Sequence, residues 1–115
     1  MRLLPGAVPQ PWYVTRSDGS PMAMAGIWQD WSKGDSQLAT CAVVTCGANA
    51  AMAPIHDRLP VILSPGDWPL WLGEAGHGAA PLMRAVADAA LTFTKVSTQV
   101  NSNRAVGEDL IAPVE

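Results

Sequence analysis

The sequence predicts an α+β domain that is mainly β, with short helices. Its 115 residues are 49% apolar with a mean hydropathy of +0.14, which is enough for one hydrophobic core. Ten glycines and ten prolines are spread along the chain rather than clustered. They interrupt it repeatedly, which favours short strands joined by turns over long helices. We therefore expect a single domain covering residues 1–115.

The first part of the chain contains three predicted strands. Residues 11–16 and 22–28 are rich in aromatic, β-branched and other apolar side chains, and Asp18-Gly19 between them tolerates the positive φ of a tight turn. We expect these two runs to pair as a strand–turn–strand hairpin. After a polar loop at residues 29–37, residues 38–45 are apolar on both faces, which predicts a central strand.

Residues 48–67 are expected to alternate between turns, a strand and a helix start. Residues 48–53 can form a helical turn before Pro54, and residues 61–63 form an apolar strand. Ser64, Pro65 and Asp67 combine an N-cap, a proline at the first helical position and an acid in the first turn, so a short helix begins here.

The remaining elements follow from apolar spacing. The buried face of the first helix is expected to be Trp68, Trp71 and Leu72, and a second helix is expected from Pro81. Residues 91–96 alternate polar and apolar side chains, which predicts a half-exposed strand. A polar run at residues 97–104 and a short apolar segment at residues 110–114 follow.

Charge and hydropathy exclude some classes of function. The net charge of -3 and a pI near 5.2 attract no phosphate globally, so a nucleic-acid site must be a local cationic patch. The longest uncharged apolar stretch contains Thr, Gly, Asn and Pro, and residues 1–8 are weaker than a secretory signal. We expect a cytoplasmic protein with no membrane segment.

Neither cysteine is expected to bind a metal or form a disulfide. Cys41 and Cys46 are five residues apart in an expected strand, so their side chains lie on opposite faces, and both are interpreted as buried. The two cysteines and two histidines show no zinc-site spacing. We predict no metal and no cofactor, and we interpret His77, between glycines, as a solvated loop residue.

The polar groups that could form a site are Thr45 and the block His56-Asp57-Arg58, which lie beside apolar strands. Histidine titrates near neutral pH and arginine binds a phosphate through two N–H groups, so together they could hold a phosphodiester. The alternative is an Asp57–Arg58 ion pair with His56 capping a carbonyl group. Among the tryptophans, Trp68 and Trp71 suit a core, whereas Trp28 and Trp31 keep a small chance of stacking on bases.

The chain resembles the SOS response-associated peptidase (SRAP) family over nearly its whole length, in order and with similar spacings. The most distinctive part is the nine-residue block at residues 55–63, IHDRLPVIL. The other similar segments are PQPWYV at residues 9–14, RSDGSP at 16–21, AGIW at 25–28, AVVT at 42–45, VSTQVN at 96–101 and LIAPV at 110–114. The resemblance covers the carboxy-terminal part of the family domain, leaves residues 1–8 unmatched, and implies a mixed or antiparallel sheet that forms a partial barrel.

The resemblance also implies a function in the SOS response and DNA repair. Family members bind abasic sites in single-stranded DNA and form a covalent thiazolidine crosslink through a cysteine exposed after removal of the initiator methionine. That autopeptidase step makes the family a class of hydrolases. Carried over to this sequence, His56 matches the catalytic histidine, Thr45 the DNA-contacting threonine, and Arg58 a phosphate or structural partner. The implied location is the cytoplasm, on the nucleoid when the protein is bound to DNA.

The sequence departs from the family pattern in its first residues. Residue 2 is Arg2 rather than cysteine, and the family's Asn and Glu have no counterpart. Cys41 and Cys46 cannot replace the nucleophile, because the thiazolidine needs a thiol and a free amine on one residue. Three hypotheses remain: a truncated crosslinking protein that is inactive alone, a binding module for single-stranded DNA or a partner, and a structural remnant that needs a separate amino-terminal half or self-associates. Whether the chain is an enzyme stays uncertain at this level.

Overall fold

The computed structural model describes residues 9–115, which fall into two compact units. Unit 1 contains the chain up to Pro21 together with Ala89–Glu115, and unit 2 is Met22–Asp88. The expectations for residues 1–8, including the mismatch at Arg2, lie outside the described residues. The two units are described separately below.

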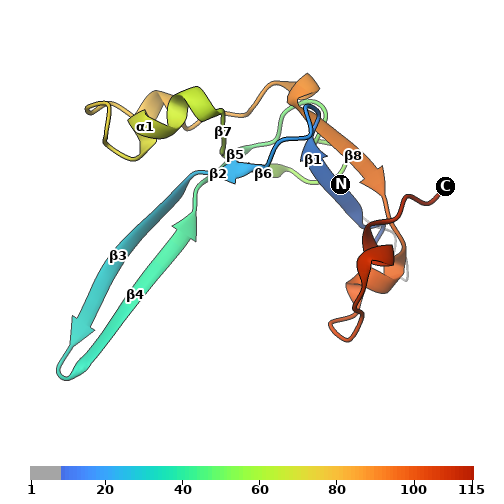
Figure 1. Ribbon diagram of the computed structural model, residues 1–115, viewed down its shortest axis with the longest axis horizontal. Helices are drawn as coiled ribbons and strands as arrows, with labels where there is room; N and C mark the ends of the chain where they lie inside the picture. The colour runs from blue at the N-terminus through green and yellow to red at the C-terminus, as the bar shows by residue number, and fades with distance from the viewer. Residues whose placement is uncertain (1–8) are drawn as a thin grey trace. The chain divides into compact units, whose positions relative to one another are not determined.

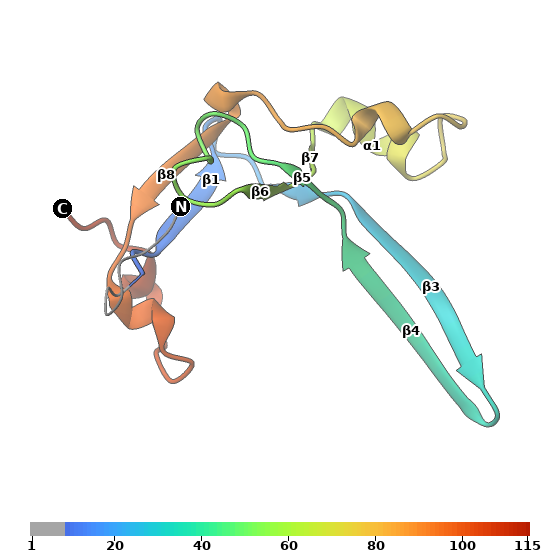
Figure 2. The ribbon, with the colours of Figure 1, turned by 180° about the vertical axis from the view of Figure 1, so that it is seen from behind.

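Unit 1 is built on one antiparallel strand pair (Figure 2). Strand β1 (Trp12–Arg16) pairs with β8 (Leu91–Lys95), and Trp12 faces Lys95 at one end of the ladder. The Lys95 ammonium lies 5.6 Å from the centroid of the Trp12 ring, a cation–π contact across the strands. The helical turns η4 (Thr98–Asn101) and η5 (Glu108–Ile111) follow β8. The predicted strand at residues 91–96 is thus confirmed.

The predicted hairpin between residues 11–16 and 22–28 is wrong, although its turn is present. The amide of Gly19 donates to the Arg16 carbonyl at 3.0 Å, and Gly19 has a φ of 77°. Asp18 accepts hydrogen bonds from the Arg16 side chain and from Ser20, which closes the turn on itself. Pro21 then supplies no N–H for a ladder. Consequently β1 pairs with β8, while β2 (Ala23–Met24) pairs with β7 (Ile62–Leu63).

The core of unit 2 is a junction at which three chain segments change pairing partners. Ala25, Val44 and Val61 each lie between two strands and bond to one another in a ring: Ala25 donates to Val61, Val61 to Val44, and Val44 to Ala25, at 2.8–2.9 Å. Ala25 and Val61 are fully buried, and Leu63 packs with them. On either side lie the pairs β2–β7 and β5–β6, which Figure 1 shows meeting at this point. Small and β-branched residues suit a place where backbones approach so closely.

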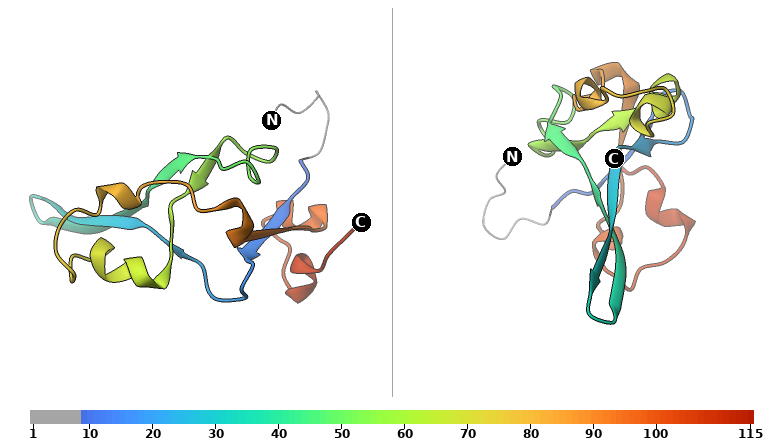
Figure 3. Two further views of the ribbon diagram at one scale, coloured as in Figure 1. Left: turned by 90° about the horizontal axis from the view of Figure 1, so that it is seen from above. Right: turned by 90° about the vertical axis from the view of Figure 1, so that its left-hand side faces the viewer.

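A long hairpin extends from this junction and replaces the polar loop predicted at residues 29–37. Strand β3 (Gly26–Lys33) pairs along its whole length with β4 (Ser36–Val43), through a turn in which Gly34 has a φ of 59° (Figures 1 and 3). Cross-strand pairs such as Trp31 with Leu38 support the ladder despite the polar residues between them. All eight residues of β4 are exposed. The prediction of a central strand at residues 38–45 is therefore wrong.

The helices are shorter than predicted. Ser64 begins the turn η1 (Pro65–Asp67) and the single α-helix, α1 (Trp68–Trp71), but its side chain makes no capping bond. The predicted second helix is only η2 (Ala80–Leu82), because the backbone at Met83 turns out of the helical region. A turn η3 (Asp88–Ala90) precedes β8.

The expected buried face of the first helix is only partly buried. Trp68 is 40% exposed and Leu72 67%, whereas Trp71 packs against the core. The helix is one turn long, so it cannot cover all three side chains at once.

The strand pairing confirms the predicted fold class. Within residues 9–115 the strands form four two-stranded antiparallel sheets, all open rather than closed, and one short α-helix accompanies them. No helix in the described part of the chain is long and apolar enough to cross a membrane.

Candidate functional site

The predicted site residues lie on and beside the strand pair β5 (Thr45–Gly47) and β6 (Arg58–Pro60) of unit 2. Thr45 faces Pro60 and Gly47 faces Arg58 in this antiparallel ladder. Thr45 and Arg58 therefore lie diagonally on one face, within reach of a long side chain. The Nη2 atom of Arg58 donates a hydrogen bond to Thr45 Oγ1 at 3.0 Å. Both residues are exposed, so the pair is open to a ligand.

The Arg58 guanidinium keeps its positive charge free for a ligand. Within residues 9–115 it forms no ion pair, and its one side-chain partner is the neutral Thr45 hydroxyl. The alternative of an Asp57–Arg58 ion pair is not what the structure shows, since Asp57 lies 3.3 Å from His56 Nδ1 instead. A guanidinium has five N–H donors in a planar fork, so several remain for a phosphate or carboxylate.

His56 is held at the entrance of β6 by its own backbone and by Arg58. Its amide donates to the Met52 carbonyl at 3.0 Å, which closes a helical turn. Its Nδ1 atom accepts the Arg58 N–H at 3.0 Å and also lies 3.3 Å from Asp57 Oδ1 and from the Arg58 carbonyl oxygen. Nδ1 cannot accept from one group and donate to another at the same time. The shorter contact comes from a donor of fixed direction, so we assign Nδ1 as the acceptor and the proton of the neutral ring to Nε2.

This assignment leaves Nε2 available for proton transfer. The His56 side chain is 63% exposed, and Nε2 makes no hydrogen bond in the described part of the chain. The ring is thus fixed through one nitrogen while the other faces outward chemistry. Arg58 connects the three predicted residues, through its backbone to His56 and through its side chain to Thr45.

Two residues that sequence reasoning missed anchor the loop between β5 and β6. Asn49 caps the turn through Oδ1, which accepts the Met52 N–H at 2.8 Å, and its Nδ2 atom donates to the Val86 carbonyl at 3.0 Å. Asp88 accepts the Ala51 N–H at 3.1 Å. An asparagine three residues before the end of its own hydrogen bond is a recognisable N-cap signal. The contacts to residues 86 and 88 had no local signal.

The cysteines and His77 lie apart from this site. Cys41 is exposed on β4 and Cys46 is half-buried on β5, so the expectation that both are buried is wrong for Cys41. The Cys46 thiol makes a weak 3.5 Å contact with the Leu59 carbonyl oxygen. His77 is exposed in a loop, as predicted.

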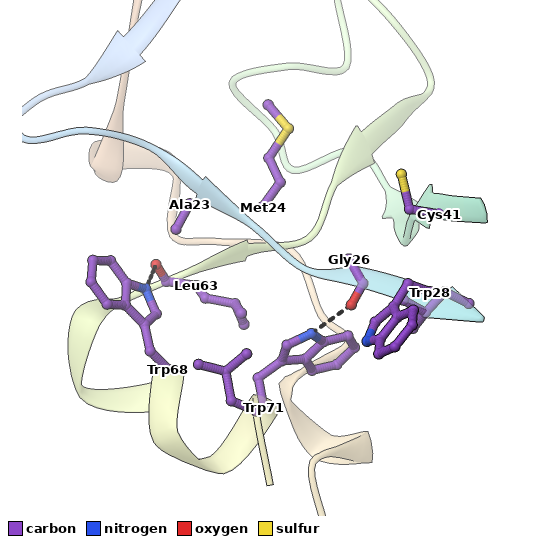
Figure 4. A pocket seen from close by; sticks show the side chains of 10 residues that line it. Ala23, Met24, Gly26, Trp28, Cys41, Leu63, Trp68 and Trp71 are labelled. Atoms are coloured by element: carbon purple, nitrogen blue, oxygen red, sulfur yellow. Dashed lines mark hydrogen bonds between the residues drawn. The ribbon is translucent and has the colours of Figure 1, made fainter. Parts of the chain in front are cut away.

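Unit 2 also contains an open apolar cavity of about 440 Å³ beside α1 (Figure 4). The Trp71 indole N–H donates to the Gly26 carbonyl at 2.9 Å, and that of Trp68 donates to the Leu63 carbonyl at 3.1 Å. These bonds fix the two rings as walls of the cavity, opposite the start of β3 (Figure 4). No charged side chain lines it, so it offers nothing to a phosphate.

Comparison with known proteins places the chain in a family. The sequence model of the SOS response associated peptidase (SRAP) family matches residues 5–103. The abasic site processing protein YedK of Escherichia coli is 30% identical over 109 residues, which are 91% of this chain and 49% of YedK. The abasic site processing protein HMCES of Gallus gallus is 34% identical over 99 residues, 82% of this chain and 29% of HMCES. The chain therefore spans half or less of the length of these curated relatives.

A solved structure supports the fold. A crystal structure of a protein from Bacteroides thetaiotaomicron superposes with a TM-score of 0.81 at 19% identity, covering 96% of this chain and 50% of that one. The family model covers most of the sequence, including Thr45, His56 and Arg58. On this evidence, the chain belongs to the SRAP family.

Proposed function

We propose that this chain is the part of an abasic site processing protein that holds single-stranded DNA at the damaged nucleotide. Its similarity to proteins named for abasic site processing supports this assignment. The observation that carries it is the exposed Arg58, whose charge has no acidic partner in the described residues and whose side chain is positioned by Thr45. The protein acts in the cytoplasm, on the nucleoid when it is bound to DNA.

In this proposal Arg58 and Thr45 bind a phosphate next to the lesion, and His56 acts on the sugar. An abasic sugar in its open-chain form carries an aldehyde. His56 is well suited to move a proton there, because its Nε2 is free while Nδ1 is held by the Arg58 N–H. Opening the ring moves one proton from the sugar hydroxyl to the ring oxygen, and a group that both accepts and donates can carry it.

The covalent step needs a second component. Thiazolidine formation joins an α-amine and a thiol of one residue to the aldehyde carbon, with loss of one water. The two cysteines, Cys41 and Cys46, are internal, so their nitrogen atoms are in peptide bonds. We infer that this sequence alone binds without crosslinking, and that the cysteine, together with the Asn and Glu that position the sugar, comes from a separate amino-terminal half. A second copy of the chain is the alternative partner.

The test is a comparison of DNA substrates. Binding of the full chain is measured by fluorescence anisotropy with a labelled single strand that carries one abasic site, with the same strand that carries thymidine there, and with the abasic strand in a duplex. The proposal expects the tightest binding to the abasic single strand, and no band that survives denaturing electrophoresis. Equal affinity for all three DNAs would contradict the assignment of the lesion as ligand. A covalent band would contradict the need for a second component.

A direct mass measurement separates binding from crosslinking in the cell. The intact mass and the amino-terminal peptide of the native protein are determined. A species that begins with cysteine supplies the missing nucleophile within one polypeptide. A species of 12.1 kDa supports a protein that binds only.

A further inference from the structure

The hairpin β3–β4 exposes more apolar surface than an isolated strand pair can keep in water. All eight residues of each strand are exposed. Trp28 is 72% exposed, Ile27 and Leu38 are each 57%, Val43 is 52% and Trp31 is 44%. A two-stranded hairpin is only marginally stable by itself and needs a third strand or a packed face. This one has neither among the described residues.

Both faces of the hairpin are apolar. Because side chains alternate along a strand, Trp31 and Leu38 lie on one face together with Ile27, and Trp28 and Cys41 lie on the other. The second face borders the apolar cavity beside α1. The first face has no cover in the described part of the chain. Strands that are apolar on both faces are typical of the interior of a domain, and soluble proteins seldom leave such a patch open.

The outer edge of β4 is also open. This strand contains no charged residue and no proline, the two devices that protect natural edges. In an antiparallel pair every second residue turns its N–H and C=O away from its partner. Since β4 pairs only with β3 within residues 9–115, these groups are available to another strand.

Charge and length identify the occupant. Residues 22–88 contain three basic and six acidic side chains, a net charge of -3, so this surface repels DNA. The solved structure with the same fold matches 96% of this chain but only half of its own length, and YedK is matched over 49%. A domain of this fold therefore includes a second part of about equal size, which must lie against some surface of the first.

We propose that the hairpin β3–β4, with the cavity beside α1, is the docking surface for that second half of an SRAP domain, carried on the same or another polypeptide. A strand of this half pairs with the open edge of β4, and its apolar face covers Ile27, Trp31 and Leu38. The inference rests on the fold and on exposed surface rather than on the DNA site. It deepens the partner named in the proposed function, but a failure of DNA binding leaves it standing.

The experiment uses the full chain and, as the probe, the half of YedK that lies outside the matched region. Association is measured by light scattering after size exclusion, and hydrogen exchange of the β4 amides is measured with and without the probe. We expect a one-to-one complex in which the β4 amides become protected. Leu38→Lys, which replaces an exposed apolar side chain on the free face, is expected to weaken association about 10- to 100-fold. Val106→Lys, a matched change at a residue of unit 1 that is 85% exposed, is expected to leave it unchanged.

Four results would each overturn the proposal. The first is a chain that is monomeric alone and already protects its β4 amides. The second is the absence of any complex with the probe. The third is an equal effect of Leu38→Lys and Val106→Lys. The fourth is a homodimer that Leu38→Lys dissociates, which would assign the surface to a second copy of the chain. Neither substitution touches Thr45, His56 or Arg58, so DNA binding can be measured on the same variants as a separate readout.

Discussion

Replacing Arg58 with alanine is the sharpest test of the site. The guanidinium is exposed, forms no ion pair within residues 9–115 and is oriented by one hydrogen bond to Thr45, so in the proposed complex it meets one phosphate. A hydrogen bond to a charged partner contributes about 1.5–3 kcal/mol. Arg58→Ala should therefore weaken binding of abasic single-stranded DNA about 10- to 150-fold at fixed salt.

Salt dependence distinguishes a phosphate contact from a general loss of charge. Each phosphate neutralised on a single strand contributes about 0.7 to the slope of log K against log salt. Arg58→Ala should reduce that slope by about 0.7, as measured by fluorescence anisotropy over a series of salt concentrations. Arg58→Lys keeps the charge but loses the planar fork, so its affinity should fall between those of the parent and the alanine variant.

Arg84→Ala is the matched control. Arg84 is another exposed arginine of unit 2, it forms no ion pair within the described residues, and its replacement changes the net charge equally. A small loss of affinity for this variant and a large one for Arg58→Ala would confirm the site. Equal losses, or a slope that Arg58→Ala leaves unchanged, would refute the reasoning, because binding would then depend on overall charge alone.

Three further predictions concern the supports of the site and of unit 1. Asn49→Ala removes a cap and a cross-loop hydrogen bond, so urea unfolding should show a loss of about 1–2 kcal/mol, and an unchanged midpoint would deny Asn49 its anchoring role. His56→Ala leaves the Arg58 N–H without its acceptor, and nitrogen NMR of the parent at high pH should find the imidazole proton on Nε2; a proton on Nδ1 would reverse our assignment. The hydrogen bond from Arg16 holds the pKa of Asp18 well below its ordinary value, so the carboxylate contributes stability above about pH 4 that is lost as the pH falls further. The melting temperature should therefore fall more steeply with acid in the parent than in Asp18→Asn, and parallel curves would contradict this.

Much of the candidate site could be predicted from the sequence, because its residues are neighbours along the chain. His56 and Arg58 are two residues apart, so a histidine nitrogen can reach the Arg58 amide whatever the rest of the fold does. The strand at residues 61–63 and the turn at Asp18-Gly19 likewise follow from local preference. The contact between Arg58 and Thr45 is different, since it exists only because β5 and β6 pair in one register.

The pairing of strands was decided by tertiary structure. Local sequence makes residues 11–16 extended, but whether they pair with residues 22–28 or with β8 depends on which arrangement buries Leu91 and Val96, at the far end of the chain. The same holds for β3 and β4, which local polarity suggested as a loop and a buried strand. Hydrogen-bonding capacity and residue preference are properties of short segments, so they specify conformation and the chemistry of neighbouring side chains. Partner, register and burial depend on surfaces that come together only when distant segments fold, and for the β3–β4 hairpin we propose that a second half of the domain is needed as well.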